Sequence, residues 1–369
     1  MAELYANAVC LAPMVRMGTL PLRLLSLRYG ADLVYGEEIV DKRIIAATRV
    51  SNGIKLLDTV DYVSNSSGSV VFRTCDEEKR KVVFQIGTAD PILALQAAER
   101  VASNVASIDI NMGCPKHFSV HGGMGAGLLR KPELACDIIK TLRRNLNIPV
   151  SCKIRLLHDT QATLDIAKSL EQAGADAIGV HARQVHERPV DSAHWEALAP
   201  VVSSLSVPVL ANGDIFVRDD IDKVRETSGA SSVMIARGAL NNPSIFREQG
   251  LLPSTEVFTV LRSYSRADEL LNVVVVDYLK ICAETENLYQ NTKYTLSRML
   301  PTKCDPRGVQ TATVADLYAT KDDPEVFALW DLQRFYKDTQ ERFSARANAC
   351  NLSVVPDQLA QLAIGASEA

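Results

Sequence analysis

Eight short apolar runs rich in β-branched residues alternate with helical patterns between residue 8 and about residue 250. The runs predicted as strands are Ala8–Val15, Ala31–Glu38, Lys81–Gly87, Ser107–Gly113, Pro149–Leu156, Ala177–Arg183, Pro208–Asp214 and Ser231–Gly238. The helices predicted between them include Pro91–Asn104, Pro132–Leu146, Thr160–Ala173 and Ser192–Ser204. Eight such repeats favour an α/β fold closed into a (β/α)8 TIM barrel over an open doubly wound sheet.

Glycine and proline mark the junctions of this pattern. Gly30, Gly174 and Gly229 each stand before a predicted strand, where glycine can end a helix in the left-handed conformation. Pro149 and Pro208 open two further strands, at a position where proline costs no ladder hydrogen bond. The segment 41–80 is long for one connection, so we expect it to insert a helix and a hairpin.

Length and pattern predict two domains and a tail. With 369 residues, the chain can hold the barrel (1–250), a smaller all-helical C-terminal domain (251–348) and a flexible end (349–369). The helices expected in the second domain are Thr255–Ser265, Asp268–Ala283 and Asp323–Ala347.

Composition narrows the function classes. An apolar fraction of 47% supports a full core, and no apolar run approaches the roughly 18 residues of a membrane span. The first residues lack a signal-peptide pattern, so we expect an intracellular protein, cytoplasmic with nucleus or mitochondrion left open. The eight cysteines contain no Cys-x-x-Cys pair, which argues against a metal site and a disulfide framework. A net charge of −4 means that any RNA site must be a local basic patch.

One predicted strand delivers a thiol to a turn. Gly113 and Pro115 flank Cys114 and stop the strand, and a glycine-rich stretch, 122–127, follows. Those glycines would allow close approach to a ligand. A thiol with an ordinary pKa of about 8.5 is protonated at neutral pH and can donate its proton. The alternative is that Cys114 is a small buried apolar side chain.

A TIM barrel places its chemistry at the C-terminal ends of the strands, and polar residues gather there. They include Arg16, Glu37, Glu38, Gln85, Asn111, Lys153, Arg155, His181, Arg183, Asn212, Asp214 and Arg237. The ends of the last two strands also suit a phosphate. Taken one at a time, Lys153 and Arg155 could be ion-pair partners, His181 a core histidine, and Asn212–Asp214 a simple turn.

Seven segments in this order resemble the tRNA-dihydrouridine synthase family. They are Leu11–Thr19, Phe84–Gly87, Asn111–Lys116, Cys152–Arg155, His181–Arg183, Ala211–Asp214 and Met234–Ala239. The glycine-rich stretch and Asn291–Tyr294 are most similar to the eukaryotic branch that reduces uridine 20 of the tRNA D-loop.

This resemblance implies an FMN enzyme that takes hydride from NADPH and passes it from flavin N5 to C6 of a uracil in tRNA. Cys114 would protonate C5 from the opposite face. The residues implied for FMN are Pro13, Met14 and Val15 along the ring, Gln85 at its polar edge, Lys153 at the N1/O2 side, and His181, Asn212, Gly213, Asp214, Ala236 and Arg237 at the phosphate end. Asn111 and Arg155 would hold the uracil, and Arg183 would reach either partner.

The helical domain is expected to hold the rest of the tRNA. Lys293 and Arg298 belong to one local basic run, and a second lies within 334–346. Both could instead be solvated helix faces. Some animal members of the branch carry an appended double-stranded-RNA-binding domain, for which too few residues follow Ala347. We expect a monomer, with the choice between NADPH and NADH open.

Two other functions remain compatible with these residues. A flavin barrel with a cysteine at its mouth would also suit a reductase of free pyrimidines. A non-catalytic tRNA-binding factor could retain FMN as a structural element.

Overall fold

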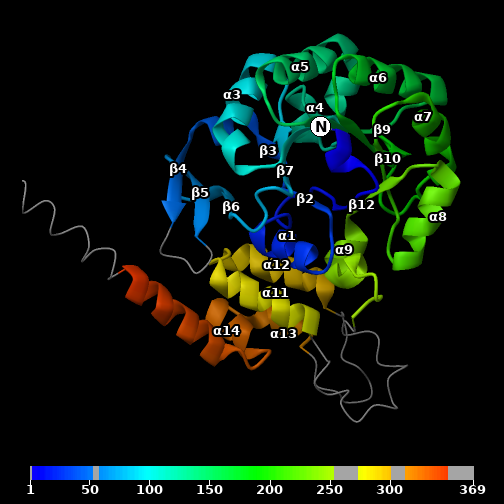
Figure 1. The fold of residues 1–369 in the computed structure, drawn as a ribbon. Helices are drawn as coiled ribbons and strands as arrows, with labels where there is room; N and C mark the ends of the chain where they lie inside the picture. Colours follow the sequence, from blue (N-terminus) through cyan, green and yellow to red (C-terminus); the bar gives the residue numbers. More distant parts are fainter. Residues whose placement is uncertain (1, 53–57, 253–272, 301–311, 348–369) are drawn as a thin grey trace, which may run out of the picture.

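The structure is a computed structural model that describes residues 2–52, 58–252, 273–300 and 312–347. Eight parallel strands close into a barrel (Figure 1), which confirms the predicted fold. They are β1 (Val9–Leu11), β2 (Leu33–Tyr35), β7 (Val82–Gly87), β8 (Ser107–Asn111), β9 (Val150–Leu156), β10 (Ala177–Gln184), β11 (Val209–Asn212) and β12 (Ser232–Ile235). The barrel closes where β2 pairs with β7, with Val34 opposite Val82. A short strand, β3 (Ile39–Val40), also pairs with β7.

Helices surround this barrel (Figure 1). They are α1 (Leu20–Arg28), α3 (Pro91–Val101), α4 (His117–His121), α5 (Pro132–Asn145), α6 (Thr160–Gln172), α7 (Ala199–Ser204), α8 (Arg218–Ser228) and α9 (Arg237–Asn241). In α5 the buried residues are Ala135, Ile138, Ile139 and Leu142, the i, i+3, i+4, i+7 spacing of one helix face. Short 3₁₀ turns complete the set, at Ala2–Tyr5, Ala102–Asn104, Gly125–Arg130, Trp195–Leu198 and Pro243–Phe246.

The helix predicted over Ser192–Ser204 starts too early. Residues 192–194 are not helical, Trp195–Leu198 forms a 3₁₀ turn, and α7 begins only at Ala199. Pro200 lies in the first turn of α7, where its missing N–H costs nothing, so it favours a helix start at this point. The predicted glycine caps do occur, and Gly30, Gly174 and Gly229 all have positive φ.

The insertion after β3 is larger than the predicted helix and hairpin. It holds α2 (Asp41–Ile45) and an antiparallel sheet of three strands, β4 (Ala47–Asn52), β5 (Thr59–Ser64) and β6 (Val70–Thr74). Tyr62 and Phe72 are buried, and Phe72 packs edge-on against Phe84 of β7 with ring centroids 4.8 Å apart. This aromatic contact attaches the sheet to the barrel.

A buried arginine ties α1 to the insertion. Arg23 is 1% exposed and pairs with Glu78, with Nη2 and Nε at 2.6 and 2.8 Å from the carboxylate oxygens. Its Nη1 donates to the Gly18 carbonyl and its Nη2 to the Arg73 carbonyl, both at 2.6 Å. Because removal of one partner leaves a buried charge, such a pair holds its elements firmly in place.

The described parts beyond the barrel are helical, as predicted, and lie beside α1 and α9 in Figure 1. They form α11 (Val273–Glu284), α12 (Tyr289–Met299), α13 (Val314–Ala319), α14 (Asp323–Ala328) and a helix over 333–347. Tyr29 Oη donates to Asp277 at 2.9 Å across this boundary. The single helix predicted over Asp323–Ala347 is wrong, because the chain turns at 329–332, where Asp331 has φ 56°.

Some predictions fall outside the described residues. The helix Thr255–Ser265 and the tail 349–369 lie there entirely, so the domain limits at 250 and 348 stay predictions. Within the described parts of the chain, no helix has both the length and the apolar character needed to cross a membrane.

Candidate active site

The predicted thiol lies on a tightly held turn directly after β8. The Asn111 carboxamide oxygen accepts hydrogen bonds from the backbone N–H groups of Gly113 and Cys114, both at 3.0 Å. The Cys114 carbonyl accepts from the Ala126 N–H at 2.9 Å. The turn is therefore fixed from the strand and from the glycine-rich segment, with the Cys114 side chain half-buried.

Gly125 explains part of that glycine-rich segment. Its φ is +55°, and a Cβ there would lie 3.0 Å from Cys114 Cβ and 2.4 Å from Ser119 Oγ. A side chain would therefore be strained and would collide with the thiol turn. This glycine is required for packing inside the protein, whereas the sequence suggested close approach to a ligand.

Two buried oxygens border the thiol. Glu38 Oε1 and Ser119 Oγ are buried, and neither has a geometric hydrogen-bond partner among the described residues. Burial raises the pKa of the Cys114 thiol. The Lys116 N–H lowers this pKa, the Glu38 charge raises it further, and the Ser119 hydroxyl lowers it. Burial also raises the pKa of Glu38. This side of the mouth favours the protonated thiol.

A polar network inside the barrel fixes Gln85. Its Nε2 donates to Asp109 at 2.8 Å, and its Oε1 accepts from Asn111 Nδ2 at 3.2 Å. Ser151 Oγ donates to the other Asp109 oxygen at 2.7 Å. Burial raises the pKa of Asp109 to about 6. Both amide atoms of Gln85 are thus engaged, which sets the orientation of the side chain at the mouth.

Lys153 comes from the neighbouring strand, β9. Burial, together with repulsion from Arg155, lowers its pKa to about 8, although Asp109 favours the charged form. Arg155 lies two residues along and donates to the Gly113 carbonyl at 2.9 Å and to the Gln184 carbonyl at 3.1 Å. Arg155 therefore connects β9 directly to the thiol turn.

The ends of β10, β11 and β12 form a cationic pocket of about 170 Å³. It is lined by predicted site residues, namely Arg155, His181, Arg183, Asn212, Gly213, Asp214, Ala236 and Arg237. Three guanidinium groups thus share the lining with one carboxylate. Arg183 binds Asp214 through both oxygens at 2.5 and 2.6 Å, and Arg237 reaches the same carboxylate at 2.5 Å. A surplus of positive charge remains for an anion.

His181 is neutral in this pocket. Burial lowers its pKa, and so do the surrounding cations Lys153, Arg155, Arg183 and Arg237. Arg183 Nη1 lies 3.2 Å from His181 Nε2, and because an arginine can only donate, Nε2 accepts and the ring proton sits on Nδ1. Burial alone would raise the pKa of Asp214, but bonds from Arg183 and the Ala193 N–H hold it low.

The segment after β1 borders the same mouth. Met14 is buried and its carbonyl accepts from the Met17 and Gly18 N–H groups, whereas Val15 is 45% exposed. The Ala12 N–H donates to the Ile235 carbonyl at 2.8 Å, which places Pro13 beside the end of β12. An apolar edge is therefore available next to the cationic pocket.

The two basic residues predicted to bind tRNA lie on α12 and do not line this pocket. Lys293 Nζ donates to Tyr289 Oη and to the carbonyls of Tyr318 and Thr320 at 2.6 to 3.1 Å. Its charge thus stabilises the helical region itself. Arg298 is exposed and lies 5.0 Å from the Tyr294 ring centroid.

Two of the four basic residues in the second run have an acidic partner one turn along their own helix. Arg334 lies 3.9 Å from Asp338, and Lys337 lies 3.8 Å from Glu341. Exposed i,i+4 pairs of this kind contribute about 0.3–0.5 kcal/mol each, so this run fits a solvated helix face.

A sequence model described as Dihydrouridine synthase (Dus) matches residues 10–266, which include the thiol turn and every residue of the cationic pocket. The chain belongs to this family. Within it, the chain is similar to the tRNA-dihydrouridine(20) synthase (NAD(P)+) of Schizosaccharomyces pombe, at 40% identity over 322 residues, covering 85% of this chain and 64% of that protein. It thus spans just under two thirds of that relative.

Two more members of the dihydrouridine synthase family show the same likeness. The tRNA-dihydrouridine(20) synthase (NAD(P)+) of Saccharomyces cerevisiae is 38% identical over 315 residues, covering 81% of this chain and 78% of that protein. A tRNA-dihydrouridine(20a/20b) synthase (NAD(P)+)-like protein of Mus musculus is 35% identical over 243 residues, covering 64% and 68%. The resemblance read from the sequence is confirmed at the level of the family.

Sequence reasoning overlooked Asp109 and Ser119 and gave Glu38 no role. Asp109 left a signal, because it is an acid between Ile108 and Ile110 in a buried strand, where an unpaired charge is costly. Ser119 left none. Glu38 stood at a predicted strand end, but only the fold shows that it reaches a thiol 76 residues away.

Proposed function

We propose that this protein reduces uridine to 5,6-dihydrouridine in tRNA, with FMN as bound cofactor and NAD(P)H as reductant. The observation that carries the proposal is the placement of a protonated thiol turn and a cationic pocket on one barrel mouth, joined through Arg155. The relatives named tRNA-dihydrouridine(20) synthases support the substrate and position 20 of the D-loop.

The residues present fit an FMN phosphate. The cationic pocket offers three guanidinium groups against one carboxylate, together with a neutral His181 whose Nδ1–H can donate. Gly238 supports the close packing of this end of the barrel, because a Cβ there would lie 2.2 Å from the Ile215 carbonyl oxygen. Asn212, Gly213, Asp214, Ala236 and Arg237 would therefore hold the phosphate end.

The flavin, when bound, supplies the hydride chemistry, and the protein supplies orientation and protons. Pro13, Met14 and Val15 would line the ring, and the fixed amide of Gln85 would meet its polar edge. Lys153 would stabilise negative charge at the N1/O2 side.

Cys114 would give its proton to C5 of the uracil from the face opposite the flavin. The Asn111 carboxamide oxygen already accepts two backbone hydrogen bonds that position this thiol. Asn111 would therefore bind the uracil only through the part of its carboxamide that these bonds do not use. Arg155 would grip the uracil edge, whereas Arg183, held by Asp191, His181 and Asp214, would act at the phosphate end. Arg298 would contact the tRNA outside the mouth, and Lys293, which donates three hydrogen bonds within the helical region, would add only positive charge there. We further propose that the protein acts as a monomer in the cytoplasm.

An anaerobic absorbance experiment tests the proposal. Purified protein reconstituted with FMN is reduced with NADPH and then mixed with unmodified tRNA, fully modified tRNA or free uridine. We expect the oxidised flavin bands to return only with unmodified tRNA, with dihydrouridine formed in equal amount. Reoxidation by free uridine would favour a small-molecule reductase, and a protein that binds FMN but is never reoxidised would favour a binding factor.

A further inference from the structure

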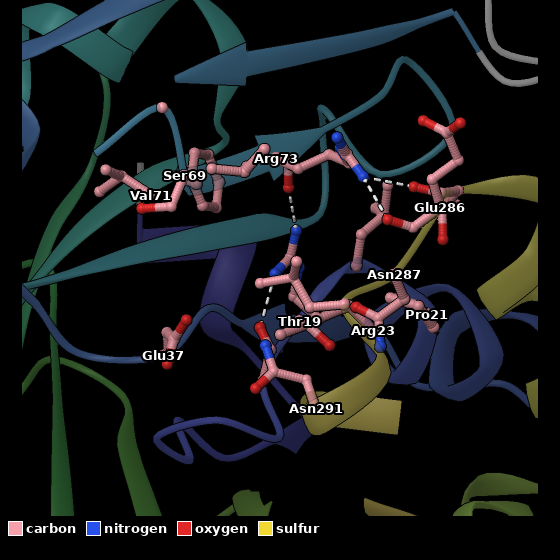
Figure 2. A pocket seen from close by; sticks show the side chains of 17 residues that line it. Thr19, Pro21, Arg23, Glu37, Ser69, Val71, Arg73, Glu286, Asn287 and Asn291 are labelled. Atoms are coloured by element: carbon pink, nitrogen blue, oxygen red, sulfur yellow. Dashed lines mark hydrogen bonds between the residues drawn. The ribbon is translucent and has the colours of Figure 1, made fainter. Parts of the chain in front are cut away.

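A second pocket lies where the barrel, the insertion and the helical region meet (Figure 2). It has a volume of about 200 Å³, and its walls are the loop after β1, strand β6 and residues 285–291. Arg73 joins these walls, because its guanidinium donates to the Thr285 and Glu286 carbonyls and pairs with Asp61 at 2.7 Å. The pocket is therefore formed by elements that are bonded to one another.

Three polar side chains on its lining have hydrogen-bonding capacity to spare. Thr19 Oγ1 is buried and has no partner among the described residues. Within that same set, the Asn291 carboxamide makes no hydrogen bond, although Asn291 lies on the lining. Glu37 uses one carboxylate oxygen to accept from the Arg16 N–H at 2.8 Å, which leaves the other free. A hydroxyl, an amide and a carboxylate are thus available to bind a ligand that has both hydrogen-bond donors and acceptors.

The rim beside Glu37 is aromatic and cationic. The Arg16 guanidinium lies 5.7 Å from the Tyr294 ring centroid, and Arg298 lies 5.0 Å from the same ring. Tyr294 follows Asn291 by three residues on α12, so both lie on the same helix face. Arginine planes and tyrosine rings together are the groups on which unstacked bases pack, and the arginines also attract phosphates.

The position of this rim links it to the active site. Arg16 directly follows Val15, the exposed residue at the apolar edge of the barrel mouth. An RNA strand that brings one nucleotide into the mouth must therefore pass close to the rim with its neighbours. The pocket itself is smaller than the roughly 300 Å³ at which pockets for drug-sized ligands begin. One base therefore fits in it, and a dinucleotide cofactor does not.

We propose that this pocket binds the base of a nucleotide directly adjacent to the target uridine, and that the base carries an exocyclic amino group. The proposal rests on the proposed function of the barrel mouth. The free Glu37 oxygen would accept from the amino group, as carboxylates do from cytosine N4. Asn291 and Thr19 would pair with the remaining base edge, and Arg16 would hold the phosphate.

Uracil lacks the amino donor, and its N3–H lies between two carbonyl oxygens that the Glu37 carboxylate would repel. Binding is weaker when a charged group in a pocket is left without its hydrogen bond. We therefore expect kcat/KM to differ by roughly tenfold or more between transcripts with the two kinds of base.

The test uses tRNA transcripts in which each nucleotide flanking the target uridine is either uridine or an amino-bearing base. We expect wild-type protein to show a kcat/KM preference of roughly tenfold for the amino-bearing base at one flank. Glu37→Gln should remove that preference, and Asn291→Ala should reduce it. Arg16→Gln should raise KM for all transcripts alike and keep the preference, because a phosphate contact carries no sequence information.

Asn145→Ala is the matched control, since this exposed asparagine lies outside both pockets and, among the described residues, its side chain bonds only to Thr141 of its own helix. It should behave as wild type, and the rate of flavin reduction by NADPH reports that each variant is folded. Equal use of all transcripts by the wild type, or a preference that survives Glu37→Gln, would overturn the proposal while tRNA reduction itself stands. If no transcript is reduced by the wild type, the proposed function fails as well.

Discussion

The two sides of the barrel mouth differ in what they do to a proton. The thiol side, built by Glu38, Cys114 and Ser119, raises the pKa of both the carboxyl and the thiol and so retains protons. The cationic side, built by Lys153, Arg155, Arg183 and Arg237, lowers the pKa of His181 and Lys153 and so releases them. One side is suited to give a proton and the other to hold an anion, although Arg155 touches both.

Replacing the thiol should have the largest effect. Cys114→Ala removes the proton donor, and general acid catalysis typically contributes 10²–10⁴-fold. We expect tRNA-driven flavin oxidation to slow by roughly that factor in stopped-flow experiments, with the rate of flavin reduction by NADPH unchanged. Equal loss in both half-reactions would contradict the separation of the two sides.

Removing a cation from the other side should weaken cofactor binding. Arg237→Ala loses a charge-assisted hydrogen bond to the phosphate, worth about 1.5–3 kcal/mol, so the Kd for FMN should rise roughly ten- to one-hundredfold. Fluorescence titration of the flavin-free protein measures this. Cys114→Ala is the control and should bind FMN as wild type does; a weakened Kd in that variant would mean that the two sides are not independent.

Lys153 makes the cationic side sensitive to pH. Its pKa of about 8 is below the ordinary value, so the cation that would stabilise reduced flavin is lost as the pH rises through about 8. The rate of flavin reduction should therefore fall above this pH, by at most about tenfold per pH unit. Lys153→Arg stays charged and should flatten the alkaline limb. An unchanged pH profile in that variant would assign the titration to another group.

The thiol side can be tuned in two directions, with the smallest effects. Glu38→Gln removes a negative charge and should lower the pKa of Cys114, whereas Ser119→Ala removes a nearby hydroxyl that favours the thiolate and should raise it. Alkylation by iodoacetamide as a function of pH measures both midpoints without flavin or tRNA. Glu37→Gln, one residue away, is the control, and shifts of the same sign in both variants would contradict the assignment.

The local sequence pattern predicted the barrel well. Strand periodicity, glycine helix caps and prolines each depend on only a few neighbouring residues, so the sequence alone shows them. It located Cys114, Lys153, His181 and Arg237 at strand ends, since topology alone brings those ends together. It extended the helix through Leu329–Leu332, where the chain turns with Asp331 at positive φ beside the buried Phe327 and Trp330, because local pattern does not show how this segment packs. It also could not show that Glu38 reaches Cys114 or that Asn111 serves the thiol turn, since these contacts depend on packing.

The most direct test is the placement of isotopes in the product. Unmodified tRNA is reduced in D₂O with NADPH deuterated at the transferred position, and the dihydrouridine is examined by NMR. Delivery from opposite faces predicts deuterium at C5 from the exchangeable thiol and at C6 by way of the flavin, whose N5 hydrogen also exchanges with solvent, in a trans relationship. A cis product, or a C5 hydrogen that does not come from solvent, would contradict proton donation by Cys114 across from the flavin.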